Sequence, residues 1–410
     1  MKTESLRIDT TRLHKALAEL GEIGALEGGG VCRLALTDED RAGRDLVCMW
    51  MRELGLSVTV DGIGNVIGIR PGREDAPPVV TGSHIDTVAA GGLYDGNLGV
   101  LAGLEVVARL NEAGIQTQRP LAVGFFTNEE GARFAPDMMG SGVHQGSMSL
   151  EPMLASIGID GKSVGSELER IGYRGATPCG DFEAAAYVEL HIEQGPVLEN
   201  ENLTIGAVTG VQGISWTEVT LLGTSNHAGT TPMSMRCDAG YAAAQLGYVI
   251  RRIAHEIGGA QVGTVGSIRL EPDLINVIAR KATLTVDLRN TDEALLAKAE
   301  ELFHTSLREI STSEGVEVAH RSLARFQPVE FDADVIERIE NHARDQGHTC
   351  RRLPSGAGHD AQMFAPNCPS GMIFVPSVKG ISHNVNEFTK PEDIEAGANV
   401  LLQTLIELAD

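Results

Sequence analysis

Short apolar runs alternate with longer amphipathic ones along the N-terminal half of the chain. The runs PPVVTG, PLAVGFF and AYVEL predict buried strands, and LGVLAGLEVVARL, between the first two, predicts a helix. An earlier helix is expected to begin near Thr37. SVTV and NVIGI flank the turn signal Asp61-Gly62, which predicts a β-hairpin. This order of elements indicates an α/β domain with a mixed central sheet.

The pattern changes near Gln212 and changes back after Gln327. Between these positions it predicts a strand, a helix, two strands, a helix and a short closing strand, VEVAH. This βαββαβ order is typical of a small α+β sandwich. A chain of 410 residues is too long for one ordinary core. We therefore expect one domain from residues 1–211 and 328–410, with residues 212–327 inserted as a smaller α+β domain.

Composition restricts the function further. The net charge of −23 argues against nucleic acid or an anionic membrane surface as a partner. No apolar run approaches the roughly 18–20 residues of a membrane span, and the N-terminal segment has no signal-peptide core. The six cysteines form no CxxC pair, as expected for reduced thiols in a cytoplasmic protein.

Residues of metal-binding type follow the predicted strands. They occur in GSHIDTVAAGGLYDG, FFTNEEGARF, LHIEQG and GISHNVNE, and are His84, Asp86, Asp95, Glu129, Glu130, His191 and His383. Ligands collect beyond the carboxyl ends of strands in open α/β sheets, so we expect these side chains to converge. Histidines and carboxylates without cysteine suit two hard-to-borderline divalent cations. The pattern therefore predicts a metallohydrolase.

Simpler interpretations exist for these residues. Asp95 precedes a predicted helix and could be its N-cap. Glu129 and Glu130 could be a solvated acidic pair, but the preceding run is apolar, and buried carboxylates are costly without a cation. Adjacent side chains on an extended segment point in different directions, so one glutamate can bind metal while the other handles protons. Asp86 could accept the free ring N–H of His84 or support its loop.

As a set, these motifs resemble the hydantoinase/carbamoylase branch of the dinuclear aminoacylase and exopeptidase superfamily. The resemblance runs from GSHIDTV through DGNLGV, EEGARF, HIEQGPVLE, NHAGTTPM, INVI and DLR to GAGHDAQ and ISHNVNE. The branch includes N-carbamoyl-L-amino-acid hydrolases, allantoate amidohydrolases and β-ureidopropionases. The resemblance implies that Asp95 bridges two metal ions, and that Glu129 is the general base and Asp86 the partner of His84. The remaining ligands would be His84, Glu130, His191 and His383.

The resemblance also implies a catalytic domain with an inserted lid that forms a homodimer. In related enzymes a lid histidine acts from the partner subunit, and His227 in TSNHAGTTP is the candidate here. It would donate to the tetrahedral oxyanion, and the simpler alternative is a turn histidine. Zn²⁺ is the first expectation for both ions, but Mn²⁺, Co²⁺ and Ni²⁺ accept the same ligands.

Four further residues are candidates for substrate binding. Arg289 ends the strand ATLTVDLR and could bind a carboxylate with two hydrogen bonds, or pair with Asp287. Asn276 could be a polar substrate contact or a turn residue, and Gln212 a donor to the ureido group or a hinge residue. Gly358 precedes a predicted helix, where backbone N–H groups can meet an anion or carbonyl.

These contacts suit a ureido carbonyl on a molecule that carries a carboxylate. An N-carbamoyl-L-amino acid is the first expectation, with allantoate and N-carbamoyl-β-alanine as alternatives. Two other classes are possible: a metal-binding module without activity, disfavoured by the presence of Glu129, and a peptidase or deacetylase that shares the metal site.

Overall fold

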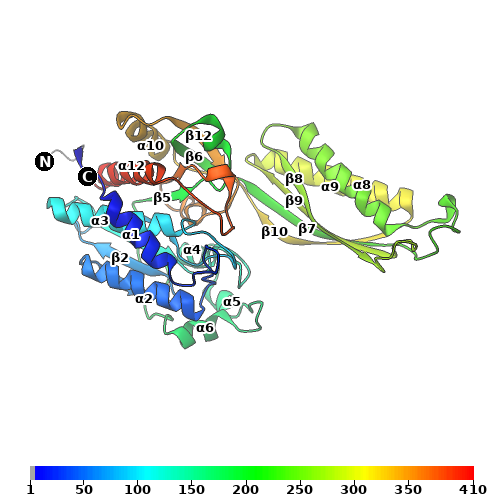
Figure 1. The fold of residues 1–410 in the computed structure, drawn as a ribbon, viewed down its shortest axis with the longest axis horizontal. Coiled ribbons are helices and arrows are strands. Elements are labelled where there is room, and N and C mark those ends of the chain that lie inside the picture. The colour runs from blue at the N-terminus through cyan, green and yellow to red at the C-terminus, as the bar shows by residue number, and fades with distance from the viewer. Residues whose placement is uncertain (1–4) are drawn as a thin grey trace. The chain divides into compact units, whose positions relative to one another are not determined.

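The computed structural model describes residues 5–410, which form two compact units. The first, called the large unit, runs through Gly210 and resumes at Glu330. The second, called the inserted unit, is Val211–Val329. Each unit has its own sheet (Figure 1).

The large unit is built on a sheet of nine strands, which is mixed, as predicted. Its strand order is β1-β2-β4-β3-β5-β13-β6-β11, and β12 pairs with β6. The strands are β1 (Ser57–Val60), β2 (Val66–Arg70), β3 (Val79–His84), β4 (Leu121–Phe126), β5 (Ala186–Ile192), β6 (Ile205–Val211), β11 (Val329–Glu330), β12 (Cys350–Ser355) and β13 (Ser370–Val375). The pairs β3–β4, β3–β5 and β5–β13 are parallel, whereas β1–β2, the predicted hairpin, is antiparallel. Strands β3, β4, β5 and β13 are fully buried, which explains their continuous apolar sequences.

Helices pack against this sheet. The longer ones are α1 (Thr10–Gly21), α2 (Asp38–Glu53), α3 (Asn97–Ala113), α10 (Ala333–Asp345) and α12 (Pro391–Ala409). Shorter ones are α4 (Met139–His144), α5 (Leu150–Leu154), α6 (Val164–Ile171), α7 (Val197–Glu201) and α11 (Asp360–Phe364). Helices α3 and α12 pack on β3 and β5, and α2 packs on β1 and β2. The Thr37 side chain accepts a hydrogen bond from Asp40 N, so it caps α2 where the sequence predicted that a helix begins.

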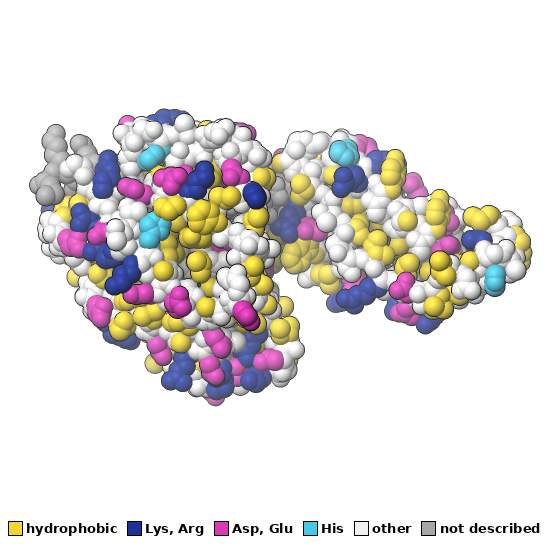
Figure 2. All heavy atoms as spheres, in the orientation of Figure 1, with side chains coloured by type: hydrophobic (Ala, Val, Ile, Leu, Met, Phe, Trp, Pro, Cys, Tyr) yellow, Lys and Arg dark blue, Asp and Glu magenta, His cyan; other side chains and the backbone are white. Residues whose placement is uncertain are grey.

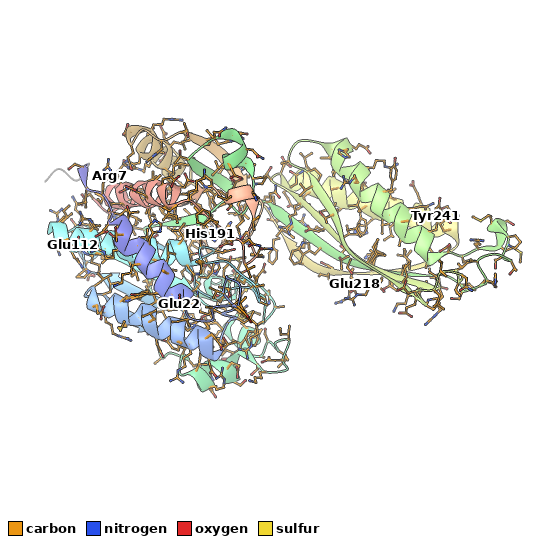
Figure 3. All side chains as sticks on the ribbon, viewed as in Figure 1. Arg7, Glu22, Glu112, His191, Glu218 and Tyr241 are labelled. Carbon is orange, nitrogen blue, oxygen red and sulfur yellow. The ribbon has the colours of Figure 1, made fainter. Side chains whose placement is uncertain are left out.

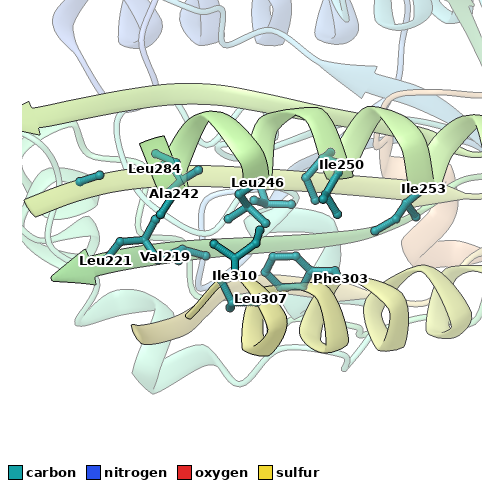
Figure 4. Packing of buried hydrophobic residues seen from close by; sticks show 14 of the residues in the cluster. Val219, Leu221, Ala242, Leu246, Ile250, Ile253, Leu284, Phe303, Leu307 and Ile310 are labelled. Atoms are coloured by element: carbon teal, nitrogen blue, oxygen red, sulfur yellow. The ribbon is translucent and has the colours of Figure 1, made fainter. Parts of the chain in front are cut away.

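The inserted unit is a four-stranded antiparallel sheet in the order β10-β7-β9-β8. Its elements are β7 (Gly213–Leu222), α8 (Ala239–Ile257), β8 (Val262–Glu271), β9 (Lys281–Asn290), α9 (Glu293–Glu314) and β10 (Glu317–Phe326). This is the predicted βαββαβ order. Apolar residues of α8 and α9 pack on one face of the sheet around Leu246, Leu284 and Phe303 (Figure 4). The closing strand was predicted to be short, but β10 has ten residues because it pairs with β7 along its length.

The surface carries both acidic and basic side chains. On the face drawn in Figure 2, acidic and basic side chains lie interspersed on both units. All six cysteines are free thiols. Among residues 5–410, no helix is both long enough and apolar enough to cross a membrane.

Candidate dinuclear metal centre

The predicted ligands lie beyond the carboxyl ends of neighbouring parallel strands in the large sheet. His84 is the last residue of β3, His191 lies near the end of β5, and Glu129 and Glu130 follow β4. These three strands run in parallel, so their carboxyl ends meet at the same edge. Asp95 precedes α3, and His383 lies in the loop after β13. Figure 3 shows His191 among the strands of the large unit.

The side chains form two groups that share Asp95. In the first group, Asp95 Oδ1 lies 3.6 Å from His84 Nε2 and 3.2 Å from His191 Nε2. In the second, His383 Nε2 lies 3.4 Å from Asp95 Oδ2 and 3.2 Å from Glu130 Oε2. Within each group the ligand atoms lie within 4.8 Å of one another. Asp95 thus offers one oxygen to each group, which is the arrangement of a bridging carboxylate.

The ring hydrogen bonds identify the nitrogens that face the centre. His84 Nδ1 donates to the carbonyl of Asp86 at 2.9 Å, and His191 Nδ1 donates to the carbonyl of Ile192 at 2.8 Å. A carbonyl can only accept, so each Nδ1 carries hydrogen and each Nε2 can be a ligand.

The spacing of these atoms fits a metal ion. With bonds of about 2.0–2.1 Å to a tetrahedral ion, neighbouring donor atoms lie roughly 3.3 Å apart. The four distances from 3.2 to 3.6 Å agree with that value. Burial by itself lowers the pKa of His84, but the charges of Glu129 and the neighbouring carboxylates outweigh it and raise this pKa well above its usual value. The centre therefore attracts positive charge, which a divalent cation would supply.

Glu129 lies beside the first group without belonging to it. Its Oε2 is 3.3 Å from His84 Nε2, and the residue is buried. Burial raises the pKa of Glu129 well above its usual range, and the nearby Asp360, Glu130 and Asp95 act in the same direction. A carboxylate of raised pKa next to a metal group has the properties of a general base.

Asp86 supports the glutamates rather than the His84 ring. Its carboxylate accepts the backbone N–H groups of Glu129 and Glu130, each at 3.3 Å. The ring of His84 bonds to the main-chain carbonyl of Asp86, not to its carboxylate. A hydrogen bond from the His84 ring to this carboxylate, one of the two sequence-based expectations, is therefore absent. The reason is that the loop after β3 turns the Asp86 side chain toward the end of β4.

Three residues without a predicted role hold Asp95. Glu387 Oε1 accepts the backbone N–H groups of Tyr94 and Asp95, each at 3.1 Å. Ser382 Oγ donates to Asp95 Oδ2 at 2.9 Å, and Gln194 Nε2 donates to the same oxygen at 2.8 Å. Glu387 and Ser382 belong to ISHNVNE and Gln194 to HIEQG, so their motifs were the signal that could have identified them.

A second buried cluster lies behind His191. Glu189 accepts hydrogen bonds from Ser83 Oγ at 2.6 Å and Ala361 N at 2.9 Å. The ring of His359 stacks edge-on against His191, with 4.6 Å between centroids, and its Nε2 is 2.9 Å from Ser355 Oγ. Glu189 thus links β3 to α11, and His359 packs against the ring of His191. Gly358 is half-buried just before His359, where a side chain would meet Met138.

His227 and Asn276 lie together in the inserted unit. Ala228 N donates to the carbonyl of Asn276 at 3.0 Å, and both residues are exposed. His227 Nδ1 accepts hydrogen bonds from Gly229 N at 3.0 Å and Thr230 N at 3.2 Å. The neutral ring must therefore carry its hydrogen on Nε2, which leaves an exposed donor. The same bonds make His227 a turn residue, so its two interpretations are compatible.

Arg289 lies at the other end of the same sheet. In the pairing of β9 with β7, Arg289 lies opposite Ile214, near the start of β7. Lys281, at the start of β9, lies opposite Leu222 at the end of β7, and His227 follows Leu222 in the chain. The eight-residue separation along β9 corresponds to roughly 27 Å. Within one chain, the inserted unit therefore does not bring Arg289 close to His227 and Asn276.

The Arg289 side chain has partners of its own. Its Nε and Nη2 donate to the Asp287 carboxylate at 3.0 to 3.1 Å, so the predicted ion pair is present. Its guanidinium lies 5.6 Å from the Trp216 ring. Gln212 is half-buried in the connection between β6 and β7, where the two units join along the chain.

The chain is similar to known proteins in both sequence and fold. Residues 80–407 match Peptidase family M20/M25/M40. The chain belongs to this family. It is 43% identical over 408 residues to an N-carbamoyl-L-amino-acid amidohydrolase from Rhizobium meliloti, covering 99% of this chain and 98% of that protein.

A solved structure and a more distant relative support membership of the same family. A hydantoinase/carbamoylase family amidase from Burkholderia multivorans superposes with a TM-score of 0.95 at 47% identity, covering 99% of both chains. A ureidoglycolate hydrolase from Arabidopsis thaliana is 34% identical, covering 99% of this chain and 88% of that protein. The family resemblance of the motifs and the fold class predicted from the order of the elements are thus confirmed.

Proposed function

We propose that the protein is a metal-dependent amidohydrolase that cleaves the carbamoyl C–N bond of an N-carbamoyl-L-amino acid. Water is consumed, and the products are the amino acid and carbamate, which decomposes to ammonia and carbon dioxide. The observation that carries the proposal is the pair of ligand groups that share Asp95, with Glu129 beside them. The similarity to N-carbamoyl-L-amino-acid amidohydrolases supports the choice of substrate.

His84, Asp95 and His191 would hold one divalent ion, and Asp95, Glu130 and His383 the other. Two such ions, when bound, polarise the carbonyl and lower the pKa of a water molecule toward ~7. Zn²⁺ is our first choice, and Mn²⁺, Co²⁺ and Ni²⁺ suit the same donors. We place the protein in the reducing cytoplasm, and its free cysteines are consistent with that location.

Glu129 would move the proton during the reaction. Because burial raises its pKa, it can take a proton from water and later give it to the leaving nitrogen. Asp86 accepts the backbone N–H groups of Glu129 and Glu130, and so fixes the position of the base relative to the ligand.

His227 would donate from Nε2 to the oxyanion of the tetrahedral intermediate. We propose that it does so from the partner subunit of a homodimer, together with Asn276. Their exposed position at one end of the inserted sheet supports this. Arg289, near the other end, would bind the substrate carboxylate, with Gln212 and Gly358 contacting the ureido group. To do so, its guanidinium must share its hydrogen bonds between Asp287 and the substrate.

A substrate panel tests the proposal. Ammonia release would be measured with metal-loaded protein on an N-carbamoyl-L-amino acid, N-carbamoyl-β-alanine, allantoate and ureidoglycolate. N-acetyl amino acids and dipeptides release no ammonia on hydrolysis, so release of the free amino acid would be measured for them, which tests the aminoacylase and peptidase alternatives. The highest kcat/KM is expected for the N-carbamoyl-L-amino acid, and preference for a dipeptide or an acetyl substrate would contradict the proposal.

A further inference from the structure

A fully buried arginine lies behind the metal centre. Arg33, in the segment CRLAL, is 0% exposed. Burial lowers its pKa to about 10, so the side chain remains charged at neutral pH. A buried cation normally has a carboxylate partner, yet the hydrogen bonds of this guanidinium go to neutral oxygens.

Those oxygens belong to three segments. Nη1 donates to the carbonyls of Leu20 and Ile23, each at 2.9 Å, at the C-terminal end of α1. The carbonyls at a helix C-terminus carry partial negative charge and stabilise a cation. Helix α2 comes close as well, because a β-carbon on Gly43 would lie 2.9 Å from Arg33 Cδ. These contacts fix the guanidinium in one position.

The other two donors reach the two ligand loops. Nε donates at 2.7 Å to the carbonyl of Ile85, which lies between His84 and Asp86. Nη2 donates at 2.8 Å to Asn97 Oδ1, two residues after Asp95. The Asn97 amide in turn donates to the carbonyl of Leu93 at 3.2 Å, and so spans the loop that carries Asp95. One rigid planar group thus joins the His84 loop to the Asp95 loop.

We propose that Arg33 is a positioning residue that sets the separation of His84 and Asp95 in the first ligand group. The proposal rests on the metal centre proposed above. Asp95 Oδ2, which faces the second group, is held independently by Ser382 and Gln194. Loss of Arg33 should therefore weaken the first ion much more than the second.

Arg33→Lys tests this, because lysine keeps the charge but its single nitrogen cannot hold the fork between Ile85 and Asn97. Zn²⁺ affinity would be measured by competition with a chromophoric chelator in two one-ion backgrounds. His383→Ala retains the first group and His191→Ala the second. Altered support of a metal ligand typically costs 10–100-fold in affinity. We expect a loss of roughly this size in the His383→Ala background and a several-fold smaller one in the His191→Ala background.

Arg44→Lys is the matched control. Arg44 is equally buried, but it donates to Asp40 at 2.8 Å, the Gly64 carbonyl at 2.7 Å and Thr127 Oγ1 at 3.3 Å, and to neither the His84 loop nor the Asp95 loop. Thr127 begins the segment that carries Glu130, so an effect of Arg44→Lys on metal binding is expected at the second group. Arg44→Lys should not reproduce the selective loss from the first group. If Arg33→Lys fails to fold, Asn97→Ala removes one end of the link and should give the same selectivity.

The experiment distinguishes failure of the proposed role of Arg33 from failure of the proposed metal centre. Wild-type protein that binds two Zn²⁺ ions, with equal losses in both backgrounds or none, would overturn the role of Arg33 alone. The same selective loss with Arg44→Lys would also overturn it, since general destabilisation would then explain both. Failure of the wild type to bind two ions would instead contradict the metal centre itself, and the role of Arg33 with it.

Discussion

Gly96 lies directly over the imidazole of His84, and a β-carbon at Gly96 would come within 2.4 Å of His84 Cε1. Gly96 has a φ of 67°, and its N–H donates to His191 Nε2 at 3.2 Å. The DGN sequence thus serves the first ligand group twice: its aspartate supplies a ligand, and its glycine makes room for another. Asp95 is not the N-cap of α3, because Gly96 occupies that position. Both roles of the DGN sequence therefore concern the ligand group and not helix capping.

Gly96→Ala should displace the His84 ring and lower occupancy of one metal ion per subunit. The measurement is metal content after dialysis against a weak chelator. Gly114→Ala is a matched control, because Gly114 also has positive φ, at 64°, but a β-carbon there would meet no atom within 4 Å. An alanine in the left-handed region of Gly114 costs about 1 kcal/mol, and one at Gly96, whose ψ of −50° lies outside that region, costs more, so metal content is compared only for variants that remain folded. Only Gly96→Ala should lose metal, and equal metal loss in both would argue against steric displacement.

Glu129→Gln should retain both metal ions and lose most turnover. The amide is nearly isosteric but cannot accept a proton, and loss of a general base typically costs 10²–10⁴-fold in kcat. Glu130→Gln is the comparison, because it weakens a ligand and should reduce metal content. Near-normal turnover of a fully metal-loaded Glu129→Gln protein would rule out this base.

Subunit complementation tests the role of His227. Inactive Glu129→Gln and His227→Ala proteins would be mixed under conditions that exchange subunits. If His227 acts across the dimer, one site of each hybrid carries both lesions and the other is intact, so activity returns. Verified exchange without recovery would place His227 in its own subunit's site.

Arg289→Ala should lower kcat/KM for substrates with a free carboxylate by roughly 10–150-fold, the value of one charge-assisted hydrogen bond of about 1.5–3 kcal/mol. Arg289→Lys should also impair them, because it loses the planar fork. Amide analogues of the substrate should be affected far less. Asp287→Asn provides the control: if it lowers activity and thermal stability as Arg289→Ala does, for charged and neutral substrates alike, the ion pair is structural.

The metal-free protein should become less stable as pH rises from about 5 to 7. Burial raises the pKa of Glu387 to about 7 and that of Asp86 to about 6, above their unfolded values. Between the unfolded and folded pKa values the folded state binds more protons, so the free energy of unfolding falls with increasing pH. Thermal unfolding with and without a chelator measures this. Glu387→Gln should flatten the metal-free profile, and an unchanged slope would show that other groups dominate.

The sequence alone determined the elements and the ligand types. Continuous apolar runs predicted β3, β4 and β5, because strands buried on both faces have no polar alternation. The end of each run identified His84, Glu129, Glu130 and His191 as candidates, since parallel strands deliver their carboxyl ends to one edge. Local periodicity was also sufficient for the βαββαβ order of the inserted unit, whose core is built from helical and strand faces that are each visible in sequence.

Contacts between distant segments were decided only by the tertiary structure. The direction of the Asp86 carboxylate depends on the packing of the β3 and β4 loops, 43 residues apart in sequence. Arg33 appears in sequence as one more surface charge, because nothing local shows that three segments converge on its guanidinium. The separation of His227 from Arg289 follows from the pairing register of β7 and β9. Local patterns report burial and period, whereas side-chain direction and long-range hydrogen bonds depend on which segments meet.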